Sequence, residues 1–415
     1  MSHLFIIPYN IASKLNPTFE LARRLKENGH RISIIGEQAL SQIAEIQRIP
    51  FIVIDEMQGF QEILNDLNPD IVLIDVEKYR YIISAVPTGI PVVLISTFVS
   101  LFKCNGLPPP HLGVIPGVGF EGSRMGIEHL WLRYRLGKWR VRLRKRIKEK
   151  GQDQISNLRR LAKRMGFDFR TEVDLNQWLT PFVCRNLPLL SFVTREFDFP
   201  HTPPPHHHYV GPMINKNRIE VIKTDEDRTV NQIKSLLSGH RNNTTQSKLI
   251  YCGFGSFFKG DDTGFLIKLI DALGENTSWK VILGLGDRVK PSSLGRLPSN
   301  FFAFNWVPQL RVLKVADCAV IHGGISSINE CIALGVPMLV FPFKINDQRG
   351  NAARVTYHQV GIVGDRDNDD AIGIRRKVEK LLNDTTYISN VLQMRSYFDR
   401  DRNNNKAVKT IESIM

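Results

Sequence analysis

The strongest chemical signal in the sequence follows the apolar run CAVI, which leads into a His-Gly-Gly turn made by His322 and ending at Gly324. Glycines let a ligand approach the backbone closely, and the N–H groups at the start of a following helix attract phosphate oxygens. We expect Ser326 and Ser327 to cap that helix and the imidazole to add a hydrogen-bond donor. The pattern predicts a site for a diphosphate.

Other polar and aromatic residues follow further apolar runs in the same half of the chain. Glu330 lies in the predicted helix, where its carboxylate can accept hydrogen bonds from ribose hydroxyls or simply complement the helix dipole. Trp306 and Gln309 occur in NWVPQL, where an indole can stack on a base, although a single Trp is often a core residue. Asp347 with Gln348 suits the vicinal hydroxyls of a hexose, or forms a solvated turn.

The elements that must position these residues alternate between short apolar runs and helical patterns. HLFII, RISII, FIVI, DIVLI and VVLIS occupy the first hundred residues, and KLIYC, WKVIL, FFAF, CAVI and PMLVF repeat the pattern later. Such alternation predicts parallel sheets with helices on their faces, that is, two successive α/β domains. Ligands of such domains bind at the carboxyl ends of the strands. One of those ends, GFGSF, offers backbone N–H groups and the Ser256 hydroxyl to a phosphate.

Composition excludes several classes of protein. The 415 residues are 42% hydrophobic and 23% charged, which is typical of globular domains. The five cysteines are scattered and form no CxxC pair, so neither a disulfide framework nor a structural zinc site is expected. The N-terminus is typical of a first strand and lacks a signal peptide, and no stretch is long enough to span a membrane. We therefore expect a cytoplasmic protein.

Most of the positive charge lies in one segment. The net charge is +14, and residues 124–164 contain fifteen Lys/Arg against three acidic residues, or 15 − 3 = +12. Within this segment an apolar stripe recurs at helical spacing through Leu132, Leu136, Trp139, Leu143 and Ile147. A helix over 131–150 can lie on anionic membrane, peripheral to its inner face, or pack on the first domain. Nucleic acid is not expected, because no recognised binding motif accompanies the charge.

Taken together, NWVPQ, HGGISSINE, GVP and P(x)₄DQ(x)₂NA resemble the donor-binding signature of family 1 glycosyltransferases of the bacterial macrolide- and carotenoid-glycosylating type. The first half resembles the family more loosely, through LNPTFELARRLKENGH and HHHYVGP. The resemblance implies a GT-B fold: two Rossmann-like domains facing a cleft, with an acceptor-binding domain at 1–211 and a nucleotide-sugar-binding domain at 212–395. A C-terminal helix at 396–415 is expected to return to the first domain.

The resemblance also implies the reaction: inverting, metal-independent transfer of a sugar from a UDP-sugar, with UDP-glucose as the expected donor, to a small-molecule acceptor. No cofactor is expected besides the co-substrate. Trp306 and Gln309 would hold the base and ribose, Glu330 the ribose, and Asp347 with Gln348 the sugar. The diphosphate would contact His322, Gly324, Ser326, Ser327 and Ser256.

The sequence departs from the family at the general base, a His that precedes an Asn-Pro-like turn in the first loop. Lys14 stands at this position, while Asp75 matches the Asp that orients the base. A lysine with an ordinary pKa of about 10.4 would need a depression of about three units, or ~4 kcal/mol, to act as a base near pH 7. A nearby Asp75 opposes that change, so an ion pair is expected.

Two interpretations of the acceptor side follow. In the preferred one, the acceptor brings an easily ionised carboxylate, acidic phenol or phosphate that Lys14 positions. Alternatively, His111 in the GLPPPHLG loop replaces the missing base. A catalytically silent nucleotide-sugar-binding homologue and a membrane-surface enzyme acting on a lipid-like acceptor such as a carotenoid are the rival functions.

Overall fold

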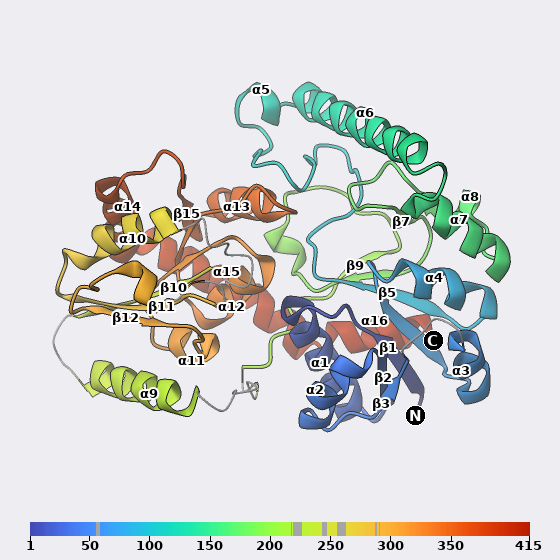
Figure 1. The fold of residues 1–415 in the computed structure, drawn as a ribbon, viewed down its shortest axis with the longest axis horizontal. Helices are drawn as coiled ribbons and strands as arrows, with labels where there is room; N and C mark the ends of the chain where they lie inside the picture. The colour runs from blue at the N-terminus through green and yellow to red at the C-terminus, as the bar shows by residue number, and fades with distance from the viewer. Residues whose placement is uncertain are drawn as a thin grey trace. The chain divides into compact units, whose positions relative to one another are not determined.

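The structure is a computed structural model that describes residues 1–54, 59–216, 218, 226–242, 247–254, 263–286, 289 and 291–415 (Figure 1). The chain divides into two compact units, the first comprising Met1–Asn215 with Phe398–Met415 and the second comprising Lys216–Tyr397. Each unit is built on its own parallel sheet. The predicted α/β class with two Rossmann-like domains is therefore confirmed.

The first unit contains a seven-stranded parallel sheet in the order β3-β2-β1-β4-β5-β8-β9. The apolar runs predicted five of these strands, whereas β8 and β9 escaped prediction because three-residue strands carry little periodicity. The strands are β1 His3–Ile7, β2 Arg31–Gly36, β3 Phe51–Val53, β4 Ile71–Asp75, β5 Val92–Ser96, β8 Leu189–Ser191 and β9 His207–Tyr209. A short antiparallel pair joins β6 Val173–Asp174 to β7 Val183–Cys184.

Helices and short 3₁₀ turns connect the strands of this sheet. They are α1 Ala12–Glu27, α2 Ser41–Ile46, α3 Phe60–Leu67, α4 Tyr79–Ala85, α5 Gly119–Gly122, α6 Arg124–Lys148, α7 Gln154–Met165 and α8 Phe169–Glu172, with 3₁₀ turns η1 Gln38–Leu40, η2 Val86–Thr88 and η3 Arg195–Phe197. The sequence predicted that Lys14 lies in a loop. Because α1 begins at Ala12, Lys14 lies instead in the first turn of a helix. Pro17 lies inside this helix and lacks the backbone N–H that would otherwise bond to the carbonyl four residues earlier.

The second unit contains a six-stranded parallel sheet in the order β12-β11-β10-β13-β14-β15, so the strand order reverses between β10 and β13. The strands are β10 Lys248–Gly253, β11 Trp279–Gly284, β12 Phe301–Phe304, β13 Cys318–Ile321, β14 Met338–Val340 and β15 Gly361–Val363. The sequence predicted all but β15. The helices are α9 Glu226–Asn242, α10 Thr263–Gly274, α11 Gln309–Leu313, α12 Ile325–Leu334, α13 Gln348–Tyr357, α14 Ala371–Asn383 and α15 Thr385–Asn403, with the 3₁₀ turn η6 Pro291–Leu294.

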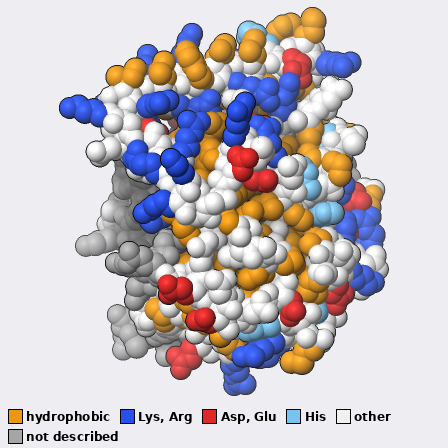
Figure 2. Space-filling view, turned by 90° about the vertical axis from the view of Figure 1, so that its right-hand side faces the viewer, with side chains coloured by type: hydrophobic (Ala, Val, Ile, Leu, Met, Phe, Trp, Pro, Cys, Tyr) orange, Lys and Arg blue, Asp and Glu red, His pale blue; other side chains and the backbone are white. Residues whose placement is uncertain are grey.

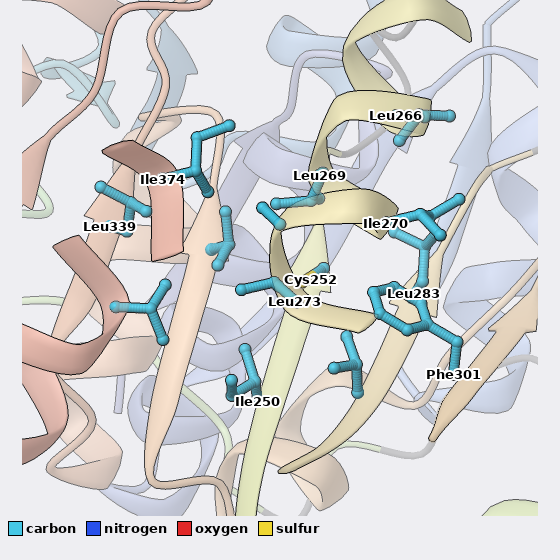
Figure 3. Packing of buried hydrophobic residues seen from close by; sticks show 14 of the residues in the cluster. Ile250, Cys252, Leu266, Leu269, Ile270, Leu273, Leu283, Phe301, Leu339 and Ile374 are labelled. Carbon is cyan, nitrogen blue, oxygen red and sulfur yellow. The ribbon is translucent and has the colours of Figure 1, made fainter. Parts of the chain in front are cut away.

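One face of the second sheet packs against α10 and α14 (Figure 3). Leu269 and Leu273 of α10 and Ile374 of α14 are fully buried against strand residues such as Ile250 and Leu283. Burying each such aliphatic side chain stabilises the fold by about 1.5–3 kcal/mol. This packing fixes the strands whose carboxyl ends carry the predicted site.

The C-terminal segment is two helices and not the single helix expected at 396–415. Helix α15 ends at Asn403, and α16 runs from Lys406 to Ile414. Asn405 between them adopts φ 52°, a left-handed conformation that ends a helix. Residues Ala407, Val408 and Ile411 of α16 are buried in the core of the first unit.

The apolar stripe of α6 faces away from the first unit. Leu132, Leu136, Trp139, Leu143 and Ile147 are all exposed. The helix itself packs on the first unit, as one of the two predicted alternatives has it, and it buries Trp131 and Lys138 there while the stripe stays exposed. Within the described residues, no helix combines the length and apolar character needed to cross a membrane.

Candidate functional site

The predicted motif residues of the second unit meet where its strand order reverses. Strands β10 and β13 pair in parallel with Gly253 opposite Ile321, so His322 follows directly at the same edge. A hydrogen bond involves the His322 ring and the Gly253 backbone. Loops at such a reversal diverge and leave room for a ligand.

The turn after β13 requires glycine. Gly323 has a φ of +84°, and a Cβ there would lie 3.1 Å from the Val340 Cγ1 atom and 3.2 Å from the Gln348 carbonyl oxygen. At Gly324, a Cβ would lie 2.7 Å from Nε2 of His322. The left-handed φ favours glycine at 323, and a Cβ at either position would force its neighbours to shift.

Helix α12 begins directly after this turn with an uncapped N-terminus. Its N-cap residue is Gly324, and no side chain of the described residues accepts a capping hydrogen bond there. The prediction that Ser326 and Ser327 cap the helix is wrong, because both lie inside its first turn and are half-buried. The backbone N–H groups of that turn carry the positive end of the helix dipole, which suits an anion.

His322 is buried beside the uncapped helix. Burial lowers its pKa to about 4, and the hydrogen bond with Gly253 only partly opposes this shift. The imidazole is therefore neutral near pH 7. Its Nδ1 atom is buried and has no hydrogen-bond partner among the described residues. Leaving a buried polar atom unpaired costs about 1–3 kcal/mol, so the atom marks a place where a ligand can supply the partner.

Glu330 lies at the centre of a polar network on the same helix. Its Oε2 accepts a hydrogen bond of 2.6 Å from Gln309 Nε2, and its Oε1 pairs with Arg218 Nη1 at 3.0 Å. The amide of Gln309 also accepts from the Tyr251 hydroxyl at 3.0 Å and donates to Ser327 Oγ at 3.5 Å. Because Glu330 lies in the second turn of α12, dipole complementation at the helix start does not explain it. Each carboxylate oxygen retains a lone pair for a sugar hydroxyl.

Asp347 and Gln348 are brought against the glycine turn. Asp347 is the N-cap residue of α13, and both side chains are buried. Gln348 Oε1 accepts from the Phe343 N–H at 3.0 Å, while Asn351 Nδ2 donates to the Gly323 carbonyl at 3.1 Å. The interpretation as a solvated turn is wrong for these two residues.

Two further predicted residues, Trp306 and Ser256, are not joined to this network by the contacts described above. Trp306 is half-buried in the segment between β12 and α11, three residues before Gln309. Ser256 lies outside the described residues. Among the described residues, no group of three or more His, Cys, Asp or Glu side chains is arranged to hold a metal ion.

Two of the residues predicted for the acceptor side, Lys14 and Asp75, lie at the corresponding edge of the first unit. Strands β1 and β4 are adjacent there, and Asp75 ends β4. Lys14 Nζ lies 3.3 Å from Asp75 Oδ1 and also pairs with Glu77, whose backbone N–H donates to the same Asp75 oxygen at 2.9 Å. The Tyr9 and Phe98 rings lie 4.7 and 4.8 Å from this ammonium. We call Lys14, Asp75 and Glu77 the lysine cluster.

The charges of the lysine cluster hold Lys14 in its protonated form. Burial by itself disfavours the ammonium, but Asp75 and Glu77 outweigh that effect and raise the pKa of Lys14 above its ordinary value. Burial raises the pKa of Asp75, and the positive charge of Lys14 opposes this shift. The ammonium is therefore a hydrogen-bond donor, and it cannot remove a proton from an acceptor near pH 7.

His111 lines a cavity of about 670 Å³ in the first unit. Its ring lies 4.7 Å from that of Tyr134 on α6, and Lys138 and Val141 also line the cavity. Lys138 is buried and donates to the Gln177 and Leu179 carbonyls, and burial lowers its pKa to about 7. The mixed lining suits a small amphipathic molecule.

Sequence reasoning missed several residues that complete these sites. Glu77 had a signal, since it follows Asp75 by two residues at a strand end. Tyr251 sits inside an apolar strand, and Arg218 comes from the segment before α9, so neither carried a signal in the sequence. Their positions depend on sheet order, which short motifs do not reveal.

Comparison with known proteins agrees with this geometry. Residues 268–413 match the family described as "Erythromycin biosynthesis protein CIII-like, C-terminal domain". The chain is 31% identical over 140 residues to NDP-glycosyltransferase YjiC of Bacillus subtilis (strain 168), covering 34% of this chain and 36% of YjiC. It is 36% identical over 105 residues to the oleandomycin glycosyltransferase of Streptomyces antibioticus, covering 25% of this chain and 24% of that protein. These matches thus span about a third or less of the relatives' length.

Solved structures extend the likeness to the whole chain at the level of fold. The glycotransferase of kitacinnamycin superposes with a TM-score of 0.66 and 20% identity, covering 100% of this chain and 99% of that one. The calicheamicin glycosyltransferase CalG4 gives 0.68 and 18%, covering 100% and 98%. The GT-B fold is therefore confirmed, as is the resemblance of the second half to bacterial macrolide-modifying family 1 glycosyltransferases.

Proposed function

We propose that this protein is an inverting, metal-independent glycosyltransferase. It moves a sugar from a UDP-sugar to a small-molecule acceptor, and glucose is the sugar that we propose. One observation carries the proposal: a buried His322 nitrogen, without a partner among the described residues, lies beside a helix N-terminus that no described side chain caps and a glycine turn at the strand reversal. The match of residues 268–413 to the erythromycin biosynthesis protein CIII-like family and the similarity to NDP-glycosyltransferase YjiC support it.

The chemistry follows from the charges at this edge. As the bond between the sugar and the diphosphate breaks, negative charge grows on the leaving diphosphate. The dipole of α12 and hydrogen bonds to its first-turn N–H groups stabilise that charge without a divalent metal. Glu330 and Gln309 hold the ribose, and Asp347 with Gln348 hold the sugar hydroxyls. Direct attack by the acceptor opposite the leaving group inverts the anomeric carbon.

The lysine cluster determines which acceptors can react. Since the pKa of Lys14 is raised, the ammonium positions an acceptor that is already ionised, such as a carboxylate, an acidic phenol or a phosphate. This preference distinguishes the proposed enzyme from relatives that use a neutral imidazole as base.

The donor half of the proposal is tested by calorimetric titration with UDP and with a panel of nucleotide sugars. UDP should bind and stabilise the protein thermally, because a ligand specific for the folded state raises its stability by mass action. His322→Asn should weaken UDP binding while retaining the melting temperature of the unliganded protein to within a few degrees. Absence of UDP binding to the wild-type chain contradicts the proposal.

The raised pKa of Lys14 favours one rival, a homologue that binds nucleotide sugar without transferring it. Transfer assays with UDP-glucose and matched acceptors, for example a benzoic acid, a nitrophenol and an aliphatic alcohol, separate the two. An enzyme should glycosylate the ionised acceptors and lose turnover in Lys14→Met. UDP binding without transfer or donor hydrolysis identifies the silent homologue, and full turnover in Lys14→Met removes the positioning role.

A further inference from the structure

Helix α6 is held on the first unit by polar groups. Trp131 Nε1 donates to the Leu107 carbonyl at 2.7 Å, and the Tyr134 hydroxyl donates to the Trp178 carbonyl at 2.6 Å. One and two turns later, Lys138 and Arg142 donate to carbonyls of residues 175, 177 and 179. Spacings of three, four and four residues place these four donors on one face of the helix.

The opposite face of α6 is apolar and exposed. We define the outer stripe as Leu132, Leu136, Trp139, Leu143 and Ile147, whose exposed fractions lie between 42% and 69%. Phe120 and Met125, just before and at the start of α6, are exposed as well. A surface helix normally buries its apolar stripe, and α6 buries Ile127, Leu130 and Trp131 near its N-terminus but leaves the outer stripe exposed. Single exposed apolar residues are ordinary, but a continuous stripe indicates an interaction surface.

Positive charge borders the outer stripe. Helix α6 contains ten Lys/Arg and one acidic residue, Glu128, which pairs with Lys103. By helical spacing, Arg133, Arg140 and Arg144 flank one side of the stripe and Arg146 flanks the other. Figure 2 shows hydrophobic and basic side chains next to each other along the upper edge, where α6 lies.

The combination selects one kind of partner. A second copy of the chain would place the same arginines against each other, which repels. A polyanion such as nucleic acid satisfies the arginines but leaves the leucines and Trp139 in water. An anionic bilayer accommodates both kinds of side chain. Its acyl chains bury the aliphatic side chains, its headgroups pair with the arginines, and Trp favours the membrane–water interface.

We propose that the outer stripe and its flanking arginines dock the protein on anionic membrane, with α6 lying in the plane of the interface. The surface does not depend on glycosyl transfer. It lies on the element that also lines the 670 Å³ cavity, so a docked protein holds that cavity near the lipid.

The experiment is sedimentation with phosphatidylglycerol–phosphatidylcholine vesicles, compared with pure phosphatidylcholine. The wild type should bind the anionic vesicles with an affinity that falls as salt rises, and its fluorescence should shift to the blue as Trp139 enters lipid. The triple change Leu136→Ser, Trp139→Ser and Leu143→Ser should reduce this affinity by about tenfold or more. Its circular dichroism and melting should remain as in the wild type, because these side chains are exposed.

Two further variants make the result specific. The change Ile372→Ser with Leu392→Ser removes exposed apolar side chains from the second unit and should leave vesicle binding intact. Arg140→Glu with Arg144→Glu should abolish the preference for anionic lipid. Failure of the wild type to bind anionic vesicles overturns the proposal, as does equal binding by the triple variant. Self-association without lipid that the triple variant abolishes, or binding to duplex DNA without binding to vesicles, overturns it in favour of those partners.

Discussion

The two units have the same kind of parallel sheet, and each has a strand pair at which the order of strands reverses. In the first unit, the edge beside β1 and β4 holds the lysine cluster, whose ammonium and carboxylates satisfy one another. In the second unit, the edge beside β10 and β13 holds a glycine turn, the N-terminus of α12 and His322, and in the described part of the chain no side chain caps that helix or pairs with Nδ1 of His322.

The difference shows how one topology supports two roles. A satisfied ion cluster stabilises the unit that contains it and sets the charge offered to a neighbouring group. A sheet edge with unpaired polar groups favours binding of a ligand that supplies the missing hydrogen-bond partners. Four changes test this contrast, taken from the largest expected effect to the smallest.

Lys14→Met should destabilise the first unit by about 3–5 kcal/mol, because it leaves the buried Asp75 beside Glu77 with no cation. Urea unfolding at pH 7 measures this. The loss should shrink as pH falls, since burial already raises the pKa of Asp75 and protonation then removes its charge. In the wild type, the contribution of Lys14 is present below its unfolded pKa and is lost as pH rises through the raised folded pKa.

The matched control is Lys344→Met, which removes an exposed pair with Asp367 and should change stability by only ~0–1 kcal/mol. Equal effects of the two substitutions would show that the lysine cluster is not a buried ion cluster.

Gly323→Ala should reduce UDP affinity by roughly tenfold to hundredfold, because a left-handed φ costs a non-glycine residue about 1–3 kcal/mol and the added Cβ crowds Val340 and Gln348. Titration calorimetry measures it. Gly295→Ala is the control, since Gly295 also has a positive φ but a Cβ there meets no atom within 4 Å. If both variants bind UDP like the wild type, the glycine turn is not at the site.

His322→Asn should weaken UDP binding by about tenfold, the loss of roughly 1.5 kcal/mol for one hydrogen bond to a charged group. A bound diphosphate favours the imidazolium and raises the pKa of His322 from about 4, so wild-type affinity should gain a component that grows as pH falls. The variant retains the titration of UDP itself but should lack that component, and parallel pH profiles would exclude His322 from the diphosphate contact.

The unliganded protein should show the reverse dependence on pH. Because the folded pKa of His322 lies below its ordinary value of 6.5, the unfolded chain binds protons first. Stability from this residue is therefore lost as pH falls from about 6.5 towards 4, and UDP should restore part of it.

Glu330→Gln should have the smallest effect, about fivefold in UDP affinity, because the amide keeps an acceptor for Gln309 but loses the charge that pairs with Arg218. Glu275→Gln removes a largely exposed pair with Arg375 and should leave UDP binding unchanged. Equal affinities of Glu330→Gln and wild type for UDP would show that the carboxylate charge does not contribute to UDP binding.

Much of the fold and of the donor-side site was predictable because its signals are local. Apolar runs rich in β-branched residues identify ten of the strands, and the turn after β13 identifies His322 and Gly324 without knowledge of sheet order. Asp347 and Gln348 also follow a strand, so the rule that ligands bind at carboxyl ends applies to them. Three-residue strands such as β8, β9 and β15 carry too few residues for a period to show.

Contacts between residues that are distant in sequence depend on which helices and strands become neighbours, and a local sequence pattern does not predict this. Arg218 and Tyr251 reach Glu330 and Gln309 from distant segments, and Glu77 joins Lys14 only because α1 begins at the edge of β4. The break at Asn405, which separates α15 from α16, likewise carried no signal that the sequence analysis used.

Helix α6 shows the division most clearly. Its sequence alone determined that one face is apolar and that arginines surround it, because a period of 3.6 residues follows from side-chain order. Only the tertiary structure decided which face meets the protein, since hydrogen bonds from Trp131, Tyr134 and Lys138 to nearby carbonyls fix the helix with its outer stripe towards solvent.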